Sequence, residues 1–77
     1  MRKSPAFTYG KLDRLLKQLG FDRLVGDGYL VYQHANGAVI PLPDMDKTTQ
    51  VRPIHALAVR KTLELNGFDQ LTYDVPL

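Results

Sequence analysis

The stretch Asp27-Gly28-Tyr29-Leu30-Val31-Tyr32-Gln33-His34-Ala35-Asn36-Gly37-Ala38-Val39-Ile40-Pro41 decides the fold. Two apolar runs, about 29–34 and 38–42, flank its dipeptide Asn36-Gly37. Asn-Gly suits a tight turn with positive φ at both central positions, so the stretch predicts a β-hairpin. A second turn signal at 26–28 follows a weaker apolar run, 21–25, which predicts one further strand.

A helix is expected on either side of these strands. Four leucines recur at helical spacing over about 9–19: Leu12, Leu15, Leu16 and Leu19. Thr8 is suited to cap the start of this helix, and Gly20 to follow its last turn in a left-handed conformation. Pro53 fits the first turn of a second helix that continues to about residue 66.

The order helix, three antiparallel strands, helix predicts an α+β fold. We expect one domain over residues 1–77, with a core of about 9–68. Neither helix can bury its apolar stripe alone, so both are expected on one face of the three-stranded sheet. The other sheet face is then open to solvent, and it is a candidate docking surface for a partner.

Composition narrows the class of protein. The chain has 77 residues and no cysteine, which excludes a disulfide framework and suits the cytoplasm. No segment is apolar for long enough to span a bilayer, so we expect no membrane association. Residues 1–26 carry six basic and two acidic groups, a net charge of +4, whereas 27–77 carry four basic and six acidic groups, a net charge of −2. The basic N-terminal part is the expected face for an anionic partner.

Several short motifs, in this order and spacing, resemble one known family. They are the segment 15–21 (LLKQLGF), the segment 32–34 (YQH) before a glycine turn, the segment 42–44 (LPD) and the segment 51–63 (VRPIHALAVRKTL). Together they cover about residues 9–68, and they resemble the HicA family of toxin–antitoxin mRNA interferases. The last segment is similar to the VRPxHLAxVRxxL pattern of one HicA-like subgroup. The resemblance implies the double-stranded-RNA-binding-domain fold, α-β-β-β-α.

The resemblance also implies an activity and a partner. Members of the family cleave mRNA with one catalytic histidine, which follows a Gly-Ser pair at the start of the second strand. They work opposite a HicB-type antitoxin that covers the toxin's site. In this chain Asp27-Gly28-Tyr29 stands where Gly-Ser-His is expected, so the catalytic position is occupied by Tyr29.

A phenol changes the chemistry expected at that position. Attack by an RNA 2′-OH needs a group that exchanges a proton near neutral pH, which histidine does with a pKa of about 6.5. The pKa of tyrosine is about 10, so it donates a hydrogen bond or stacks on a base but is a poor proton acceptor. We therefore expect RNA binding with cleavage lost or weakened.

Two alternatives stay open. The protein is an active mRNA interferase that uses His34 or His55 after a local rearrangement, or it is a protein-interaction module that docks through its open sheet face or its third strand. Strand alternation puts Tyr29 and His34 on opposite faces, and the simpler role for His34 is to bond the turn at 36–37.

The expected RNA contacts follow from charge and position. Basic residues of the two helices are suited to phosphates, and the turn and second strand to the rest of the nucleotide. The predicted RNA-binding residues are Lys11, Arg14, Lys17, Gly28, Tyr32, Arg52, Arg60 and Lys61. The histidines and acidic residues show no metal-ligand spacing, so neither a metal nor another cofactor is expected.

Overall fold

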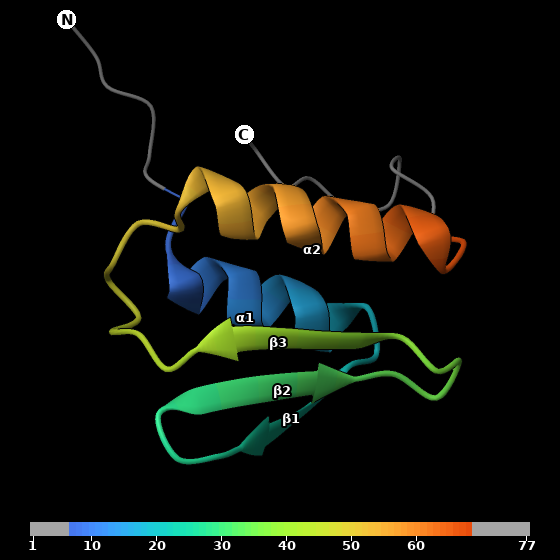
Figure 1. Ribbon diagram of the computed structural model, residues 1–77, viewed down its shortest axis with the longest axis horizontal. Coiled ribbons are helices and arrows are strands. Elements are labelled where there is room, and N and C mark those ends of the chain that lie inside the picture. The colour runs from blue at the N-terminus through green and yellow to red at the C-terminus, as the bar shows by residue number, and fades with distance from the viewer. Residues whose placement is uncertain (1–6, 69–77) are drawn as a thin grey trace, which may run out of the picture.

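The computed structural model describes residues 7–68. Its elements are, in chain order, α1 (Tyr9–Gln18), β1 (Asp22–Val25), β2 (Tyr29–Gln33), β3 (Val39–Pro43) and α2 (Pro53–Leu65). The three strands form one antiparallel sheet in the order β1-β2-β3. The predicted α+β order of a helix, three antiparallel strands and a helix is therefore confirmed (Figure 1).

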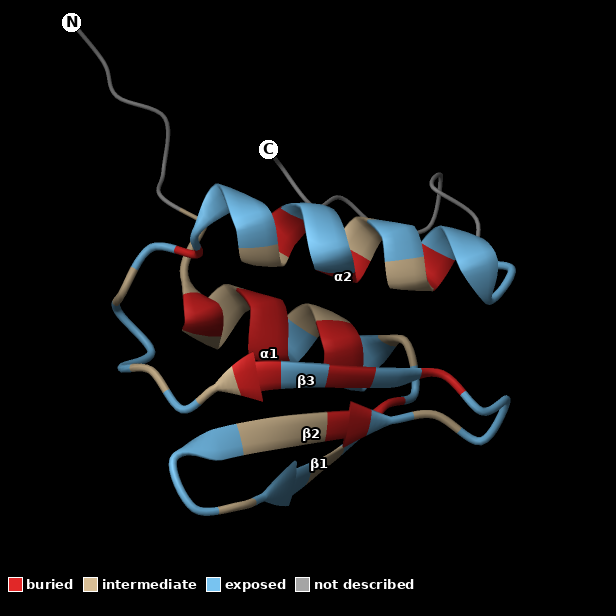
Figure 2. Ribbon diagram, in the orientation of Figure 1, coloured by how far each residue is buried: buried red, intermediate tan, exposed pale blue. Residues whose placement is uncertain are grey.

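Both helices lie on the same side of the sheet, and the core fills the space between the helices and the sheet (Figures 1 and 2). The predicted leucine stripe supplies two fully buried side chains, Leu12 and Leu16, while α2 supplies Val59 and Leu63. Opposite them, alternate residues of β2 and β3 face the helices, because a strand turns successive side chains to opposite faces. The inward set includes Leu30, Tyr32, Ile40 and Leu42.

The helix ends form as their sequence signals predict. The Thr8 hydroxyl accepts a hydrogen bond from the backbone N–H of Lys11 at 3.3 Å, as an N-cap does. Gly20 has a φ of +97°, which ends α1 in the left-handed region open to glycine. Pro53 occupies the first turn of α2, where a helix leaves backbone N–H groups without an internal partner.

The hairpin forms, but the prediction of a tight two-residue turn at Asn36-Gly37 is wrong. Of the two residues, Gly37 has a positive φ, +100°, but Asn36 does not, because only glycines have positive φ within residues 7–68. The loop has three residues, because the N–H of His34 bonds the Ala38 carbonyl at 2.9 Å and the N–H of Gly37 bonds the His34 carbonyl. The Asn36 side chain accepts from the N–H of Ala38 at 2.9 Å, and this bond favours the longer loop.

The loop between β3 and α2 is tied to the start of α1. The N–H groups of Tyr9 and Gly10 have no partner within their own helix, and they donate to the carbonyls of Thr49 at 2.9 Å and Lys47 at 3.0 Å. A Cβ atom on Gly10 would lie 3.0 Å from the Lys47 carbonyl oxygen, so glycine allows this close approach. The loop is thereby fixed beside α1, and it forms one wall of the site described next.

Candidate functional site

Tyr29, at the position where the resemblance expects a histidine, begins β2 directly after the turn at 26–28. Its side chain is 50% exposed, and its backbone pairs with Pro43 at one end of the sheet. Its ring stands over Gly26, where a Cβ atom would overlap it. Among residues 7–68 no hydrogen bond reaches the Tyr29 hydroxyl. The position therefore holds a half-exposed phenol whose hydroxyl has no hydrogen-bond partner within the described residues.

His34 uses both of its ring nitrogens inside the fold. Nδ1 faces the backbone N–H of Asn36 at 3.0 Å, and Nε2 faces the Leu19 carbonyl at 3.0 Å. An N–H group can only donate and a carbonyl can only accept, so the ring carries its proton on Nε2 and is neutral. The edge-on contacts with Phe21 and Phe68, 5.1 Å between ring centroids in each case, hold the ring in place. The predicted bond from His34 to the turn is confirmed, and neither nitrogen is free to move a proton in this arrangement.

His55 lies in the first turn of α2, and its Nε2 has no hydrogen-bond partner among residues 7–68. Its Nδ1 lies 2.8 Å from the hydroxyl of Tyr9, which also accepts from the backbone N–H of Arg52 at 3.3 Å. The partly buried ring lines a hollow of about 270 Å³, together with Arg52, Pro43 and Met45. His55 lies on the helical side of the sheet, whereas Tyr29 faces outward, so the two do not form one site.

A buried ionic cluster, which the sequence did not indicate, lies between α1 and the sheet. Asp13 is 8% exposed, and its Oδ1 accepts from the hydroxyl of Tyr32 at 2.7 Å and from the guanidinium of Arg23 at 3.2 Å. Its Oδ2 is 3.3 Å from the ammonium of Lys17. The carboxylate of Asp13 is therefore surrounded by three donors from three elements of the fold.

These neighbours fix the charge states of the cluster. Partial burial acts to raise the pKa of Asp13, but the hydrogen bonds from Tyr32 and Lys17 and the positive charge of Arg23 outweigh it and lower that pKa. Burial raises the pKa of Tyr32, and the adjacent Asp13 carboxylate raises it further. Asp13 stays an anion and Tyr32 stays a hydrogen-bond donor at neutral pH.

Tyr32 was expected to contact RNA, and its position argues against that role. The side chain is 2% exposed and belongs to the core, where its ring packs under the helices and its hydroxyl bonds Asp13. A base can stack only on a ring with an open face. Tyr32 therefore holds the Asp13 carboxylate through its hydroxyl, and its buried ring has no open face for a nucleotide.

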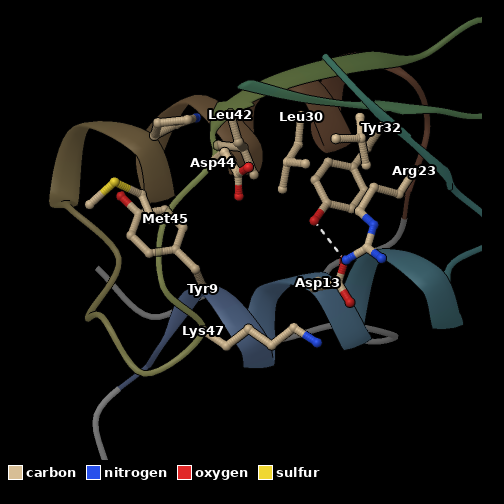
Figure 3. Close-up of a pocket in the computed structure, with 11 residues that line it drawn as sticks. Tyr9, Asp13, Arg23, Leu30, Tyr32, Leu42, Asp44, Met45 and Lys47 are labelled. Atoms are coloured by element: carbon tan, nitrogen blue, oxygen red, sulfur yellow. Dashed lines mark hydrogen bonds and ion pairs between the residues drawn. The ribbon is translucent and has the colours of Figure 1, made fainter. Parts of the chain in front are cut away.

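A cavity of about 210 Å³ adjoins this cluster (Figure 3). Its apolar walls come from α1, the inner sheet face and the β3–α2 loop, and they include Tyr9, Leu30, Leu42 and Met45. Its charged groups are Asp13, Arg23, Asp44 and Lys47. Tyr9, Pro43 and Met45 also line the hollow beside His55, so the two spaces adjoin.

No family model, curated protein or solved structure matches this chain. Neither helix within residues 7–68 has the length and apolar character needed to cross a membrane. Among the same residues, no three His, Cys, Asp or Glu side chains lie close enough together to hold a metal ion.

The predicted cations lie on two helices, and the structure brings some of them together. Arg14 of α1 shares a shallow hollow with Lys47 of the β3–α2 loop, next to Asp13. Lys17 joins the same region through its ion pair with Asp13, and Lys11 lies one turn earlier on α1. The cations of α2 are spread along that helix: Arg52 at its start and Arg60 and Lys61 in its middle. Gly28, with a φ of +81°, belongs to the turn before Tyr29.

Proposed function

We propose that this chain is an RNA-binding, HicA-like protein of a toxin–antitoxin system in which mRNA cleavage is lost or weakened. The element order and the placement of both helices on one sheet face support the proposal, because the resemblance implies this arrangement. By the same resemblance, we place the protein in the cytoplasm, opposite a HicB-type antitoxin.

One observation carries the proposal: an exposed phenol stands at the position expected for the catalytic histidine, and no hydrogen bond from residues 7–68 reaches its hydroxyl. Tyr29 is exposed at the start of β2, so it can meet an RNA strand. A phenol with no neighbouring base is a poor proton acceptor at neutral pH. His34 has both nitrogens bonded within the fold, and His55 lies on the other side of the sheet. Binding can therefore persist where proton transfer fails.

The RNA-binding part of the proposal rests on exposed cations of α1 and the β3–α2 loop. Arg14 and Lys47 are exposed and line the hollow at the start of α1. Lys17, also exposed, lies in the last turn of α1 and pairs with Asp13. Phosphate contacts from Lys and Arg supply most of the sequence-independent affinity for nucleic acid, and they weaken steeply as salt rises. We expect the chain to bind single-stranded RNA with that salt dependence.

The test compares the native chain with Tyr29→His and Tyr29→Phe on one labelled RNA. The native chain and both variants should shift the RNA on a gel at low salt. Only Tyr29→His should release cleavage products, because it alone restores a group that titrates near neutral pH. Efficient cleavage by the native chain contradicts the loss of activity, and its disappearance in His55→Ala would assign it to that residue. Failure to bind RNA at about 50 mM salt, where phosphate contacts are strongest, contradicts the RNA-binding proposal itself.

A second function, docking of a protein partner, is favoured by the open sheet face. The outward side chains of the three strands include the apolar or aromatic Leu24, Tyr29, Val31, Val39 and Pro41, with the polar Asp22 and Gln33 at one end, and no lysine or arginine is among them. Leu24 and Val39 are about half exposed. An apolar sheet face without cations suits a protein surface better than a phosphate backbone. The partner proposed for this face is the HicB-type antitoxin. Val39→Lys, at the opposite end of β3 from Pro43, the partner of Tyr29, should weaken its binding while the α1 cations keep their affinity for RNA.

A further inference from the structure

The cavity of about 210 Å³ beside Asp13 has the size and the wall chemistry of a site for one small ring system. Drug-sized ligands occupy about 300–1,000 Å³, so this cavity suits a single base better than a whole nucleotide. Tyr9, Leu30 and Met45 provide apolar wall on which a planar ring can pack. Pro43 lines the cavity and pairs with Tyr29 in the sheet, so the cavity lies at the same end of the sheet as Tyr29.

The four charged side chains of the cavity differ in whether they already have a hydrogen-bond or ion-pair partner. Asp13 and Arg23 are engaged with each other and with Tyr32 and Lys17. The carboxylate of Asp44, by contrast, has no hydrogen bond or ion pair with any other side chain of residues 7–68, and it points into the cavity (Figure 3). Lys47 lies along the opposite wall, also without a partner within the described chain. The cavity thus presents one free anion and one free cation across an apolar space.

The backbone of the segment that carries both free charges is hydrogen-bonded to the rest of the fold. The N–H of Asp44 donates to the Gly28 carbonyl at 3.2 Å, and the Lys47 carbonyl accepts from Gly10 at 3.0 Å. Asp46, between them, accepts from the backbone N–H and the hydroxyl of Thr48, each at 3.0 Å. A backbone that is already ordered costs less entropy on binding than a mobile loop does, and only the two side chains remain to be ordered.

We infer that this cavity binds one unpaired guanine base of an RNA strand. Guanine carries two adjacent donors, N1–H and N2–H, which match the two oxygens of the Asp44 carboxylate. Its acceptors O6 and N7 lie on another side of the ring, where they can accept from the Lys47 ammonium. Adenine puts an acceptor at N1, and cytosine offers one amino group, so neither matches a carboxylate at two points. The inference rests on the proposed RNA binding and names the base that this binding selects.

The experiment measures the affinity of short oligouridines that carry one central guanosine, adenosine or cytidine, by fluorescence anisotropy with the full chain. The guanosine strand should bind about tenfold more tightly than the adenosine strand, within the range of one bidentate side chain–base pair. Asp44→Asn should reduce this preference to about onefold, because an amide offers one acceptor in place of two. Asp27→Asn is the matched control: it removes the same charge from a nearby exposed turn, and it should keep the preference.

Titration with free guanosine and adenosine, followed through the backbone amide NMR signals of residues 44–47, separates the two proposals. Equal affinity for the three strands, or a preference that survives in Asp44→Asn, overturns the guanine site and leaves RNA binding intact. Binding of guanosine but of no RNA strand overturns the proposed function and supports the cavity. Binding of neither overturns both.

Discussion

Removing one hydroxyl from the core should cost this protein a large part of its stability. Tyr32→Phe keeps the buried ring and deletes only the O–H that donates to Asp13 at 2.7 Å. Hydrogen bonds to charged groups contribute about 1.5–3 kcal/mol. Because Arg23 and Lys17 still bond the carboxylate in the variant, we expect about 2 kcal/mol, in the lower part of that range. A chain of 77 residues has a free energy of unfolding of about 4–12 kcal/mol, so the loss is substantial.

The magnitude can be assigned to the Tyr32–Asp13 pair with a double-mutant cycle. Asp13→Asn preserves the size of the side chain but leaves Arg23 and Lys17 without their anion. Urea unfolding, followed by far-UV circular dichroism, gives the free energies of the native chain, both single variants and the double variant. We expect a coupling of about 1–2 kcal/mol between the two substitutions, since the side chains are in direct contact.

The same cluster should give the protein a specific dependence on acid. The folded pKa of Asp13 lies below the ordinary value of 3.8, so the unfolded chain binds more protons at low pH. Its stabilising contribution is therefore complete above the unfolded pKa and is lost as pH falls through the folded one. Asp13→Asn should lose less stability than the native chain between neutral and strongly acidic pH. Parallel pH curves for the two proteins, or a cost below about 0.5 kcal/mol for Tyr32→Phe, would refute the reasoning.

Two further predictions concern the ring of His34 and the glycine beneath it. Nitrogen-detected NMR at neutral pH should find the His34 proton on Nε2, with Nδ1 as an acceptor; a proton on Nδ1 would contradict the bond from Asn36. Gly20→Ala should destabilise the fold by about 1 kcal/mol more than Gly37→Ala does. This difference is the net contribution of one hydrogen bond, the one that the Gly20 variant would disturb. Both positions have positive φ, but only at Gly20 does a Cβ atom approach His34 Nε2, at 3.0 Å, and disturb its bond to Leu19. Equal urea midpoints for the two alanine variants would show that this contact does not matter.

The sequence predicted those parts of the fold that depend on local patterns. Leucine spacing, Thr8, Gly20 and Pro53 located both helices, because caps and apolar stripes act within a few residues of the positions that carry them. The hairpin was located too, but the turn type was wrong at Asn36. The bonds that chose the longer loop use the side chain of Asn36 and the backbone of Ala38, and the Asn-Gly signal does not report them.

The candidate site depends on contacts between distant segments, which explains why it was missed. No role for Asp13 was predicted from the sequence, although a buried tyrosine needs a partner for its hydroxyl. Strand alternation, which puts Tyr32 and the apolar Leu30 on one face, was the signal available in the sequence. Nothing in the sequence around Gly10 indicates that the β3–α2 loop approaches within 3.0 Å of the position where its Cβ would be.

The two tyrosines of β2 have different surroundings: one is exposed to solvent and the other is buried in the core. Tyr29 and Tyr32 are three residues apart, so alternation turns one to solvent and the other to the core. A substitution at the exposed position should change stability by no more than about 0.5 kcal/mol, while losing the hydroxyl of Tyr32 removes a bond on which the Asp13 cluster depends. The exposed position can therefore carry a histidine or a phenol without disturbing the strand that presents it. By this reasoning Tyr29→His should fold as the native chain does, so that any cleavage it gains reports chemistry at that one position.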